Sequence, residues 1–203
     1  MKMRSLMLVV SGIAALSVAA LSTSASERIK LTPEMSEKEI ARLHPKDVEP
    51  SLLPLDSIEE LHTTGTPQEV NVATWRLRVK GEKVNASLSL TYEELSQMEM
   101  IEKKVILICP GFFVDYAEWE GVPLSTIFEK AKVEEGYETI TFYALDGYSS
   151  RFSREEVENN LLFLALKVNG ETLPKEHGFP VRLVAEDILG GRWVKWISAI
   201  DLK

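Results

Sequence analysis

The chain of 203 residues is short of cysteine, histidine and positive charge. Its one cysteine, Cys109, excludes an internal disulfide, and no two of its three histidines have the spacing of zinc ligands on a helix. The 23 lysines and arginines are outnumbered by 31 aspartates and glutamates, which gives a formal net charge of −8. Since nucleic-acid phosphates attract proteins with surplus positive charge, a nucleic-acid partner is not expected.

Familiar catalytic and nucleotide-binding motifs are also missing. The chain has no phosphate-binding loop, no glycine-rich dinucleotide fingerprint and no GxSxG nucleophile elbow. A nucleophilic pair of Cys109 and His177 stays open, because the members of such a pair need not be neighbours in sequence. What is present is 45% apolar and 27% charged residues, a balance typical of a chain that folds around one core.

The N-terminus has the pattern of a secretory signal peptide. Lys2 and Arg4 precede an apolar stretch over residues 6–21, and Thr23 and Ala25 are small residues at suitable cleavage positions. We therefore expect residues 1–25 to be removed and the mature chain to be exported, to the periplasm or the extracellular space, without a membrane span. An uncleaved anchor is the alternative, but the apolar stretch is shorter than the roughly 20 residues that a spanning helix needs.

Export has a consequence for Cys109, because exported proteins meet an oxidising compartment. An unpaired thiol there is a buried inert side chain, a partner in an intermolecular disulfide, or a functional ligand or nucleophile. Cys109 ends the apolar run VILIC and precedes a Pro-Gly step. At the level of these residues alone, all three interpretations stay open.

Residues 26–71 are polar and carry five prolines, so we expect an extended arm that leads into the domain. One short helix is predicted in TPEMSEKEIARL, with Thr32 as the N-cap and Pro33 in the first helical position.

Residues 72–203 alternate strand and helix patterns and predict a single α+β domain with a mainly antiparallel or mixed sheet. Capping boxes begin two of the helices, at Thr91 and at Ser153, and Ser125 is the predicted cap of a third. Asn169-Gly170 predicts a hairpin turn. The predicted strands are residues 75–81, 104–109, 138–145, 161–168, 179–185 and 192–202, and the predicted helices are residues 90–98, 125–133 and 153–159.

Three segments, in order and spacing, carry a more specific pattern. They are CPGFFVDYAEWEGVPLSTIFEKA, YALDGYSSRFSREE and LALKVNGETLPKEHGFPVRLVAEDILGGRWVKWISAIDL. Together they resemble the oxidoreductase molybdopterin-binding domain family, which includes sulfite oxidase, plant-type nitrate reductase and the periplasmic methionine sulfoxide reductase catalytic subunit. The resemblance covers residues 72–203 and implies the molybdopterin-binding fold of sulfite oxidase, here with an extended N-terminal arm.

The resemblance also implies a molybdenum–molybdopterin cofactor, whose metal is held by the pterin's enedithiolate and by the thiolate of Cys109, the expected catalytic position. A thiolate is a soft anionic donor that suits a sulfur-rich metal centre. The positions that match the family's cofactor contacts are Cys109, Asp146, His177, Arg182, Gly190, Gly191, Arg192 and Lys195.

These residue types fit the implied ligand. Arginines such as Arg182 and Arg192 can hold a phosphate with two parallel hydrogen bonds, and adjacent glycines let backbone N–H groups approach an anion. Taken alone, however, RWVKW also fits a strand with its charges in water, GG also fits a turn, and Asp146-Gly147 also fits a turn.

The chain departs from the sulfite-oxidising members just after the cysteine, where these members place arginines. Pro110, Gly111, Phe112 and Phe113 stand there instead, and Asp115 adds a negative charge, so sulfite is not the expected substrate. No haem-binding or flavin-binding extension accompanies the matched segments. Electrons are therefore expected to pass to or from a separate partner protein.

Two functions follow from these observations. The first is an exported molybdopterin-dependent oxidoreductase that performs two-electron oxygen-atom transfer on a small substrate such as an S-oxide or N-oxide, and the retained Cys109, Arg182 and Arg192 favour it. The alternative is a cofactor-free exported domain that uses the same pocket to bind a ligand or partner. The leader MKMRSL favours this alternative, because it lacks the Arg-Arg pair of the route that exports folded, cofactor-loaded proteins.

Overall fold

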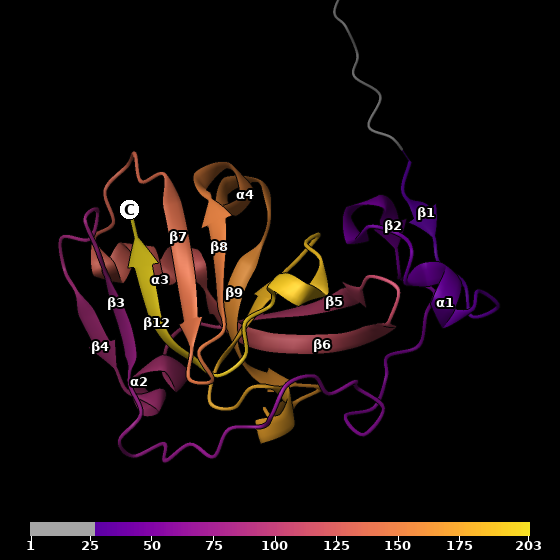
Figure 1. Cartoon of the computed structure of the whole chain (residues 1–203), viewed down its shortest axis with the longest axis horizontal. Helices are drawn as coiled ribbons and strands as arrows, with labels where there is room; N and C mark the ends of the chain where they lie inside the picture. The colour runs from indigo at the N-terminus through magenta and orange to yellow at the C-terminus, as the bar shows by residue number, and fades with distance from the viewer. Residues whose placement is uncertain (1–26) are drawn as a thin grey trace, which may run out of the picture.

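The computed structural model describes residues 27–203, so the predicted signal peptide lies outside the described residues (Figure 1). The predicted α+β class is confirmed: short helices accompany two five-stranded sheets and a small two-stranded one. More strands are present than predicted. Several of the additional ones are short, but β6 (Phe113–Pro123) has 11 residues and was also missed, because no strict alternation of apolar and polar residues marks it.

The first five-stranded sheet is antiparallel and contains the Cys109 strand. Its strands are β5 (Ile101–Cys109), β6 (Phe113–Pro123), β9 (Leu162–Val168), β10 (Glu171–Thr172) and β11 (Arg182–Ala185). β9 lies between β6 and both β10 and β11, and nearly all of its side chains are buried, as its continuous apolar run predicts. The hairpin turn between β9 and β10 is formed by Asn169 and Gly170, both at positive φ, as predicted.

The second sheet is mixed. It consists of β3 (Leu77–Gly81), β4 (Leu88–Leu90), β7 (Thr139–Ala144), β8 (Ser149–Ser153) and β12 (Ile197–Leu202), and β12 runs parallel to β3 while the other pairs are antiparallel. The helices are α1 (Glu37–Ile40), α2 (Tyr92–Ser96), α3 (Leu124–Ala131) and α4 (Arg154–Asn159). Single 3-10 turns are η1 (Pro45–Asp47), η2 (Lys175–His177) and η3 (Gly190–Arg192).

The β5–β6 hairpin has two differently covered faces, because alternate side chains of a strand point to opposite sides. Val105, Leu107, Ala117 and Trp119 belong to the main core, where Trp119 is buried. Ile106, Ile108 and Tyr116 belong to a second small core on the other face. The turn after Cys109 places Pro110 before Gly111, whose φ of 76° suits the glycine position of a type II turn.

The N-terminal arm supplies the cover for that second face. Leu31, Ile40 and Val48 pack on the hairpin, and the arm's small sheet pairs β1 (Ile29–Lys30) with β2 (Val48–Glu49). Each such buried aliphatic side chain contributes up to about 1.5–3 kcal/mol of hydrophobic stabilisation. In Figure 1 this indigo region lies beside the end of β5 and β6 at which the loop joins the two strands. The arm is therefore an integral layer around the Cys109 strand.

The arm also satisfies an open edge of β6, which pairs with β9 only from Trp119 onward. The N–H groups of Val114 and Tyr116 donate to the carboxylates of Glu37 and Asp56, at 2.9 and 2.7 Å. Unpaired strand edges are a liability that folds must cover. In this chain, Glu37 and Asp56 of the arm cover the open edge of β6. This contact explains why acidic residues occur in an otherwise irregular segment.

Several predicted boundaries are wrong: the strand predicted from residue 179 begins only at Arg182, and three others differ as follows. The arm's helix begins at the capping box of Ser36 and Glu39, two mutually satisfying groups, rather than at Thr32. The N-cap of α3 is Pro123, so Ser125 lies inside the helix. The capping boxes at Thr91 and Ser153 are confirmed.

The third wrong boundary concerns RWVKW, predicted as the start of the last strand. β12 begins only at Ile197, because Trp196 has a φ of 51°, which no extended strand tolerates. The indole N–H of Trp196 donates to the Lys175 carbonyl at 2.7 Å, which ties this bend to η2. Residues 193–196, between η3 and β12, therefore form an irregular segment.

Candidate functional site

The site begins with Cys109, the last residue of β5 and a free, partly exposed thiol. Partial burial raises the pKa of this thiol, and the nearby carboxylate of Asp115 raises it further. With its pKa raised, the group is a protonated thiol at neutral pH. A metal would change this, since a coordinating thiol loses its proton.

Arg182 is the most unusual charged residue near the thiol. β11 carries it into the protein interior, where only 4% of its surface is exposed. Its guanidinium carbon lies 4.6 Å from the ring centre of Trp119 and 5.5 Å from that of Trp193. Burial lowers its pKa to about 10, against a weaker opposite effect of Asp115.

The Arg182 guanidinium also lacks a counter-ion within the chain. Among residues 27–203, no carboxylate lies within 4.0 Å of it and its buried Nε has no hydrogen-bond acceptor. A buried cation without a partner costs several kcal/mol, and the two indole rings offset only about 2 kcal/mol of that cost each at most. An anionic ligand would complete this environment.

Lys195 adds a second cation beside Arg182. Its Nζ donates to the carbonyls of Thr64 and Glu176, at 2.7 and 2.9 Å. Burial, together with the charge of Arg182, lowers its pKa to about 8. Gly178 makes this close approach possible, since a Cβ there would lie 3.0 Å from the Cβ atoms of both Arg182 and Lys195. The glycine of the HGFPV motif is thus part of the site's framework, a role that sequence reasoning missed.

Two cavities meet at these residues. A cavity of about 50 Å³ is lined by Cys109, Asp115 and Arg182, and one of about 240 Å³ by Asp146 and Tyr148. Both are also lined by Thr64, Gly190, Gly191, Trp193 and Lys195. The thiol, the two cations and the Gly-Gly segment therefore belong to one depression of the surface.

The two adjacent glycines have different roles in this depression. A Cβ at Gly190 would lie 2.4 Å from Leu107 Cδ2, so this glycine is required for packing on β5. A Cβ at Gly191 would meet nothing within 4 Å, and its carbonyl accepts a hydrogen bond from the Tyr148 hydroxyl at 2.6 Å. Gly191 is the one that leaves open space at the cavities.

Asp146 and His177 lie at the margin of the site. Asp146 lines the larger cavity and accepts a hydrogen bond from the Tyr148 N–H at 2.9 Å, so it serves a turn and faces the depression at once. His177, in η2, is buried and lines neither cavity. Burial lowers its pKa, with further lowering by Arg182 and Lys195, so its imidazole is neutral at pH 7.

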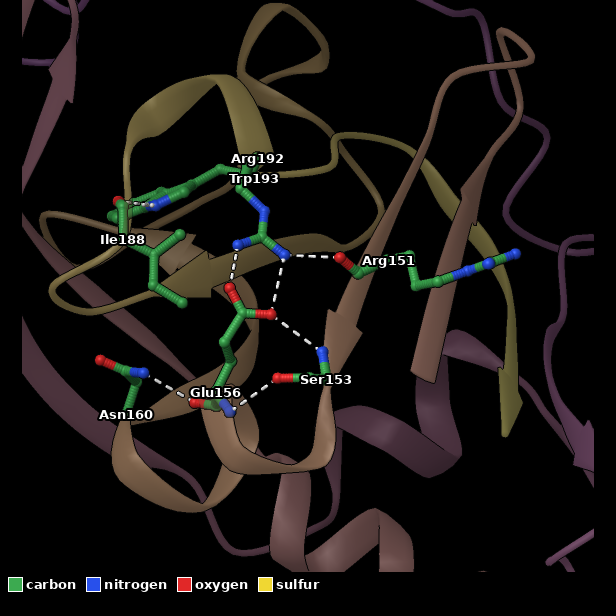
Figure 2. A network of polar contacts seen from close by, with 7 residues as sticks. All are labelled: Arg151, Ser153, Glu156, Asn160, Ile188, Arg192 and Trp193. Carbon is green, nitrogen blue, oxygen red and sulfur yellow. Dashed lines mark hydrogen bonds and ion pairs between the residues drawn. The ribbon is translucent and has the colours of Figure 1, made fainter. Parts of the chain in front are cut away.

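Arg192 is not brought to the thiol. Figure 2 shows its guanidinium turned toward α4, where it pairs with both carboxylate oxygens of Glu156 and donates to the Arg151 carbonyl. It also lies 4.1 Å above the ring centre of Phe152. This arginine has a full set of partners within the chain, in contrast to Arg182.

His62 and Thr64 come from the arm and were not predicted as site residues. Asp115 Oδ1 accepts hydrogen bonds from the His62 backbone N–H at 3.0 Å and from its Nδ1 at 2.8 Å. The His62 ring stacks on Phe113, the cross-strand partner of Cys109, at 4.6 Å. No periodic pattern in the arm indicates this contact, because it depends on how the arm wraps the hairpin.

A larger cavity of about 430 Å³ lies between α3 and α4, lined by residues such as Phe128, Tyr137 and Val157. It shares no lining residue with the cavities around Cys109. Its only basic group, Arg154, is paired with Glu158. The chemistry therefore lies at the smaller depression, which gathers the thiol and the unpaired cation.

The fold and the site together define an α+β domain in which the Cys109 thiol and the buried Arg182 cation line one cavity that suits an anionic ligand. Comparison with known proteins identifies the family to which this domain belongs. The family model described as oxidoreductase molybdopterin binding domain matches residues 63–203, and the chain belongs to this family. The match begins inside the arm and includes Thr64.

Individual relatives agree with this assignment. Mitochondrial sulfite oxidase of Rattus norvegicus is 28% identical over 64% of this chain and 29% of its own length. The uncharacterized oxidoreductase YuiH of Bacillus subtilis is 30% identical over 71% of this chain and 73% of its own. The crystal structure of the sulfane dehydrogenase SoxCD from Paracoccus pantotrophus matches with a TM-score of 0.62 and 26% identity, over 67% of this chain and 40% of that one. The predicted sulfite oxidase-like fold is thereby confirmed, while this chain spans less than a third of sulfite oxidase itself.

The residues present fit the family's cofactor. The orphaned Nε of Arg182, the ammonium of Lys195 and the open space at Gly191 suit an anionic group, and Cys109 offers one soft sulfur ligand. Among residues 27–203, no three His, Cys, Asp or Glu side chains converge on a common metal position. Along the same residues, no helix has the length and apolar character to cross a bilayer.

Proposed function

We propose that this chain is an exported oxidoreductase that holds a molybdenum–molybdopterin cofactor at Cys109 and performs two-electron oxygen-atom transfer on a small molecule. The observation that carries the proposal is the buried Arg182 guanidinium, which has no carboxylate partner and lines the same cavity as the thiol. A fold retains such a costly arrangement when a ligand completes it.

Each residue has a defined part in this proposal. The Cys109 thiolate would bind the metal, Arg182 and Lys195 would hold anionic groups of the pterin, and Gly191 would leave room for it. When bound, the cofactor supplies the metal centre and the two electrons for oxygen-atom transfer. The chain's own contribution is to bind, orient and surround it.

The surroundings of Cys109 favour a neutral substrate. Phe113 and the buried carboxylate of Asp115 line the cavity, and Phe112, at the tip of the hairpin, is 83% exposed and adds no charge. A neutral S-oxide or N-oxide meets less electrostatic repulsion there than sulfite would. A separate electron-carrying protein is the proposed redox partner.

Elemental analysis of the mature protein, purified from its native host, tests the proposal. We expect near-stoichiometric molybdenum in the wild type and none in Cys109→Ser, with the same urea midpoint for both metal-free proteins. Wild-type protein without molybdenum would favour the cofactor-free binding domain, which the absence of an Arg-Arg pair beside Lys2 and Arg4 supports. A fusion of residues 1–30 to a reporter that works only after folded export tests the route separately.

A further inference from the structure

His62 stands between two cavities. An acidic cleft of about 370 Å³ lies between the arm and β6 and is lined by Glu37, Asp56, Glu60 and His62. The small cavity at Cys109 lies on the other side. Among the described residues, His62 is the one side chain that lines both. Its side chain is 45% exposed, whereas Asp115 is 5% exposed, so the pair spans from solvent to the interior.

The contacts of His62 fix its orientation and tautomer. Because Asp115 Oδ1 lies 2.8 Å from Nδ1 and an ionised carboxylate only accepts, Nδ1 carries the proton. Nε2 is then free to take up or release a proton, and it lies 3.7 Å from Glu37 Oε1. Stacking on Phe113, with an angle of 16° between the rings, holds the imidazole in place. This is the arrangement of a histidine oriented by a buried carboxylate.

Charged groups of opposite sign lie on the two sides of the His62–Asp115 pair. The acidic groups that face His62 are Glu37, Asp56, Glu60 and Asp115. Four ionisable groups interact electrostatically with Asp115. They are Cys109 of β5, Arg182 of β11, His177 of η2 and Lys195 of the irregular segment. Carboxylates therefore surround His62 on the solvent side, and the cations Arg182 and Lys195 lie on the inner side, beside Asp115.

We propose that His62 and Asp115 form a proton relay that connects the acidic cleft with the Cys109 cavity. The inference rests on the proposed function, because oxygen-atom transfer requires protons. Reduction of an S-oxide to a sulfide consumes two electrons and two protons and releases one water, so the sulfur–oxygen bond breaks and two oxygen–hydrogen bonds form. The electrons come from an external one-electron donor, and the relay delivers the protons through a cavity that bulk water barely enters.

The test uses the molybdenum-loaded mature protein, with reduced viologen as electron donor and dimethyl sulfoxide as substrate. We expect His62→Gln and Asp115→Asn to lower the turnover rate by roughly 10²-fold and to remove the pH dependence set by His62, with unchanged molybdenum content. Added imidazole restores the rate of His62→Ala, because the cleft admits a small base. Glu59→Gln removes an exposed charge from the same arm at a residue that lines neither cavity, and it keeps the wild-type rate.

The outcomes separate the relay from the proposed function. Protein without molybdenum overturns both. Loaded His62 variants with the wild-type rate and pH profile overturn the relay alone. Loaded wild type that reduces no S-oxide overturns the proposed S-oxide substrate together with the relay that serves it. A readout without turnover is the imidazole nitrogen spectrum of ¹⁵N-labelled protein. It shows protonated Nδ1 if the relay is right and protonated Nε2 if it is wrong, and Asp115→Asn shifts this balance.

Discussion

Arg182 and Arg192 come from one sequence segment yet lie in opposite environments. Arg182 is buried between two tryptophan rings and has no carboxylate within 4.0 Å among the described residues. Arg192 is one-third exposed and is paired with Glu156 and the Arg151 carbonyl. The first arginine lies beside the thiol, and the second fastens η3 to α4 (Figure 2).

The two arginines therefore differ in function: Arg192 stabilises the fold, whereas Arg182 is available to bind a ligand. A cation whose partners are all within the chain contributes to the folded state directly, whereas an unpaired buried cation lowers stability until something binds it. Proteins tolerate such local inconsistencies mainly at functional sites. The matched motif thus contains one arginine that stabilises the chain and one that is available to a ligand.

The largest effect is expected for Arg182→Met. The variant removes the buried charge but keeps most of the side-chain volume, so the metal-free protein should gain about 1–4 kcal/mol in free energy of unfolding. The loss of a charged hydrogen-bonding group should lower the molybdenum content of the purified protein at least about tenfold. Urea unfolding of the metal-free protein and elemental analysis of the loaded protein measure the two changes.

Arg192→Met is the matched control, because it makes the same chemical change at the paired arginine. Its molybdenum content should equal that of the wild type, and its free energy of unfolding should fall by about 1 kcal/mol. If both arginine variants lose the metal equally, the division of roles between Arg182 and Arg192 is wrong.

Local patterns predicted what depends on neighbours in sequence. The capping boxes at Thr91 and Ser153 are confirmed, because each needs only residues one turn apart. The strand character of β9 is confirmed as well, because the continuous apolar run over residues 161–166 has the length of a buried strand. The α+β class follows from such elements taken together.

The site depends on contacts that no local pattern contains. Arg192 and Glu156 meet only because η3 packs on α4, so the motif alone could not distinguish this arginine from Arg182. His62 reaches Asp115 because the arm bends around β6, and its sequence there shows no periodicity. The alternation in RWVKW indicated a strand, yet packing forces Trp196 to a positive φ.

The pH dependence of the free energy of unfolding tests the second cation of the site, Lys195, against the paired Arg192. Burial lowers its folded-state pKa to about 8 from an ordinary value of 10.5. Between these values the unfolded chain binds more protons, so the free energy of unfolding rises with pH through this window, by roughly 2 kcal/mol. In Lys195→Met the rise should be absent, as urea midpoints of the metal-free proteins between pH 7.5 and about 10.5 would show. An equal rise in both proteins would contradict the assignment to Lys195.

The smallest effect is expected for Glu156, the carboxylate that pairs with Arg192. The hydrogen bond from Arg192 lowers the pKa of Glu156 below its ordinary value of 4.5. A depressed carboxyl pKa adds stability above the unfolded value, and this stability is lost as the pH falls through the folded one. Glu156→Gln should therefore lose about 0.5–1 kcal/mol at pH 7, after allowance for solvent screening, and progressively less as the pH falls below 4.5. Since Glu156 lines neither cavity at Cys109, its molybdenum content should match the wild type, and a loss of metal would show that the α4 junction and the cofactor site are coupled.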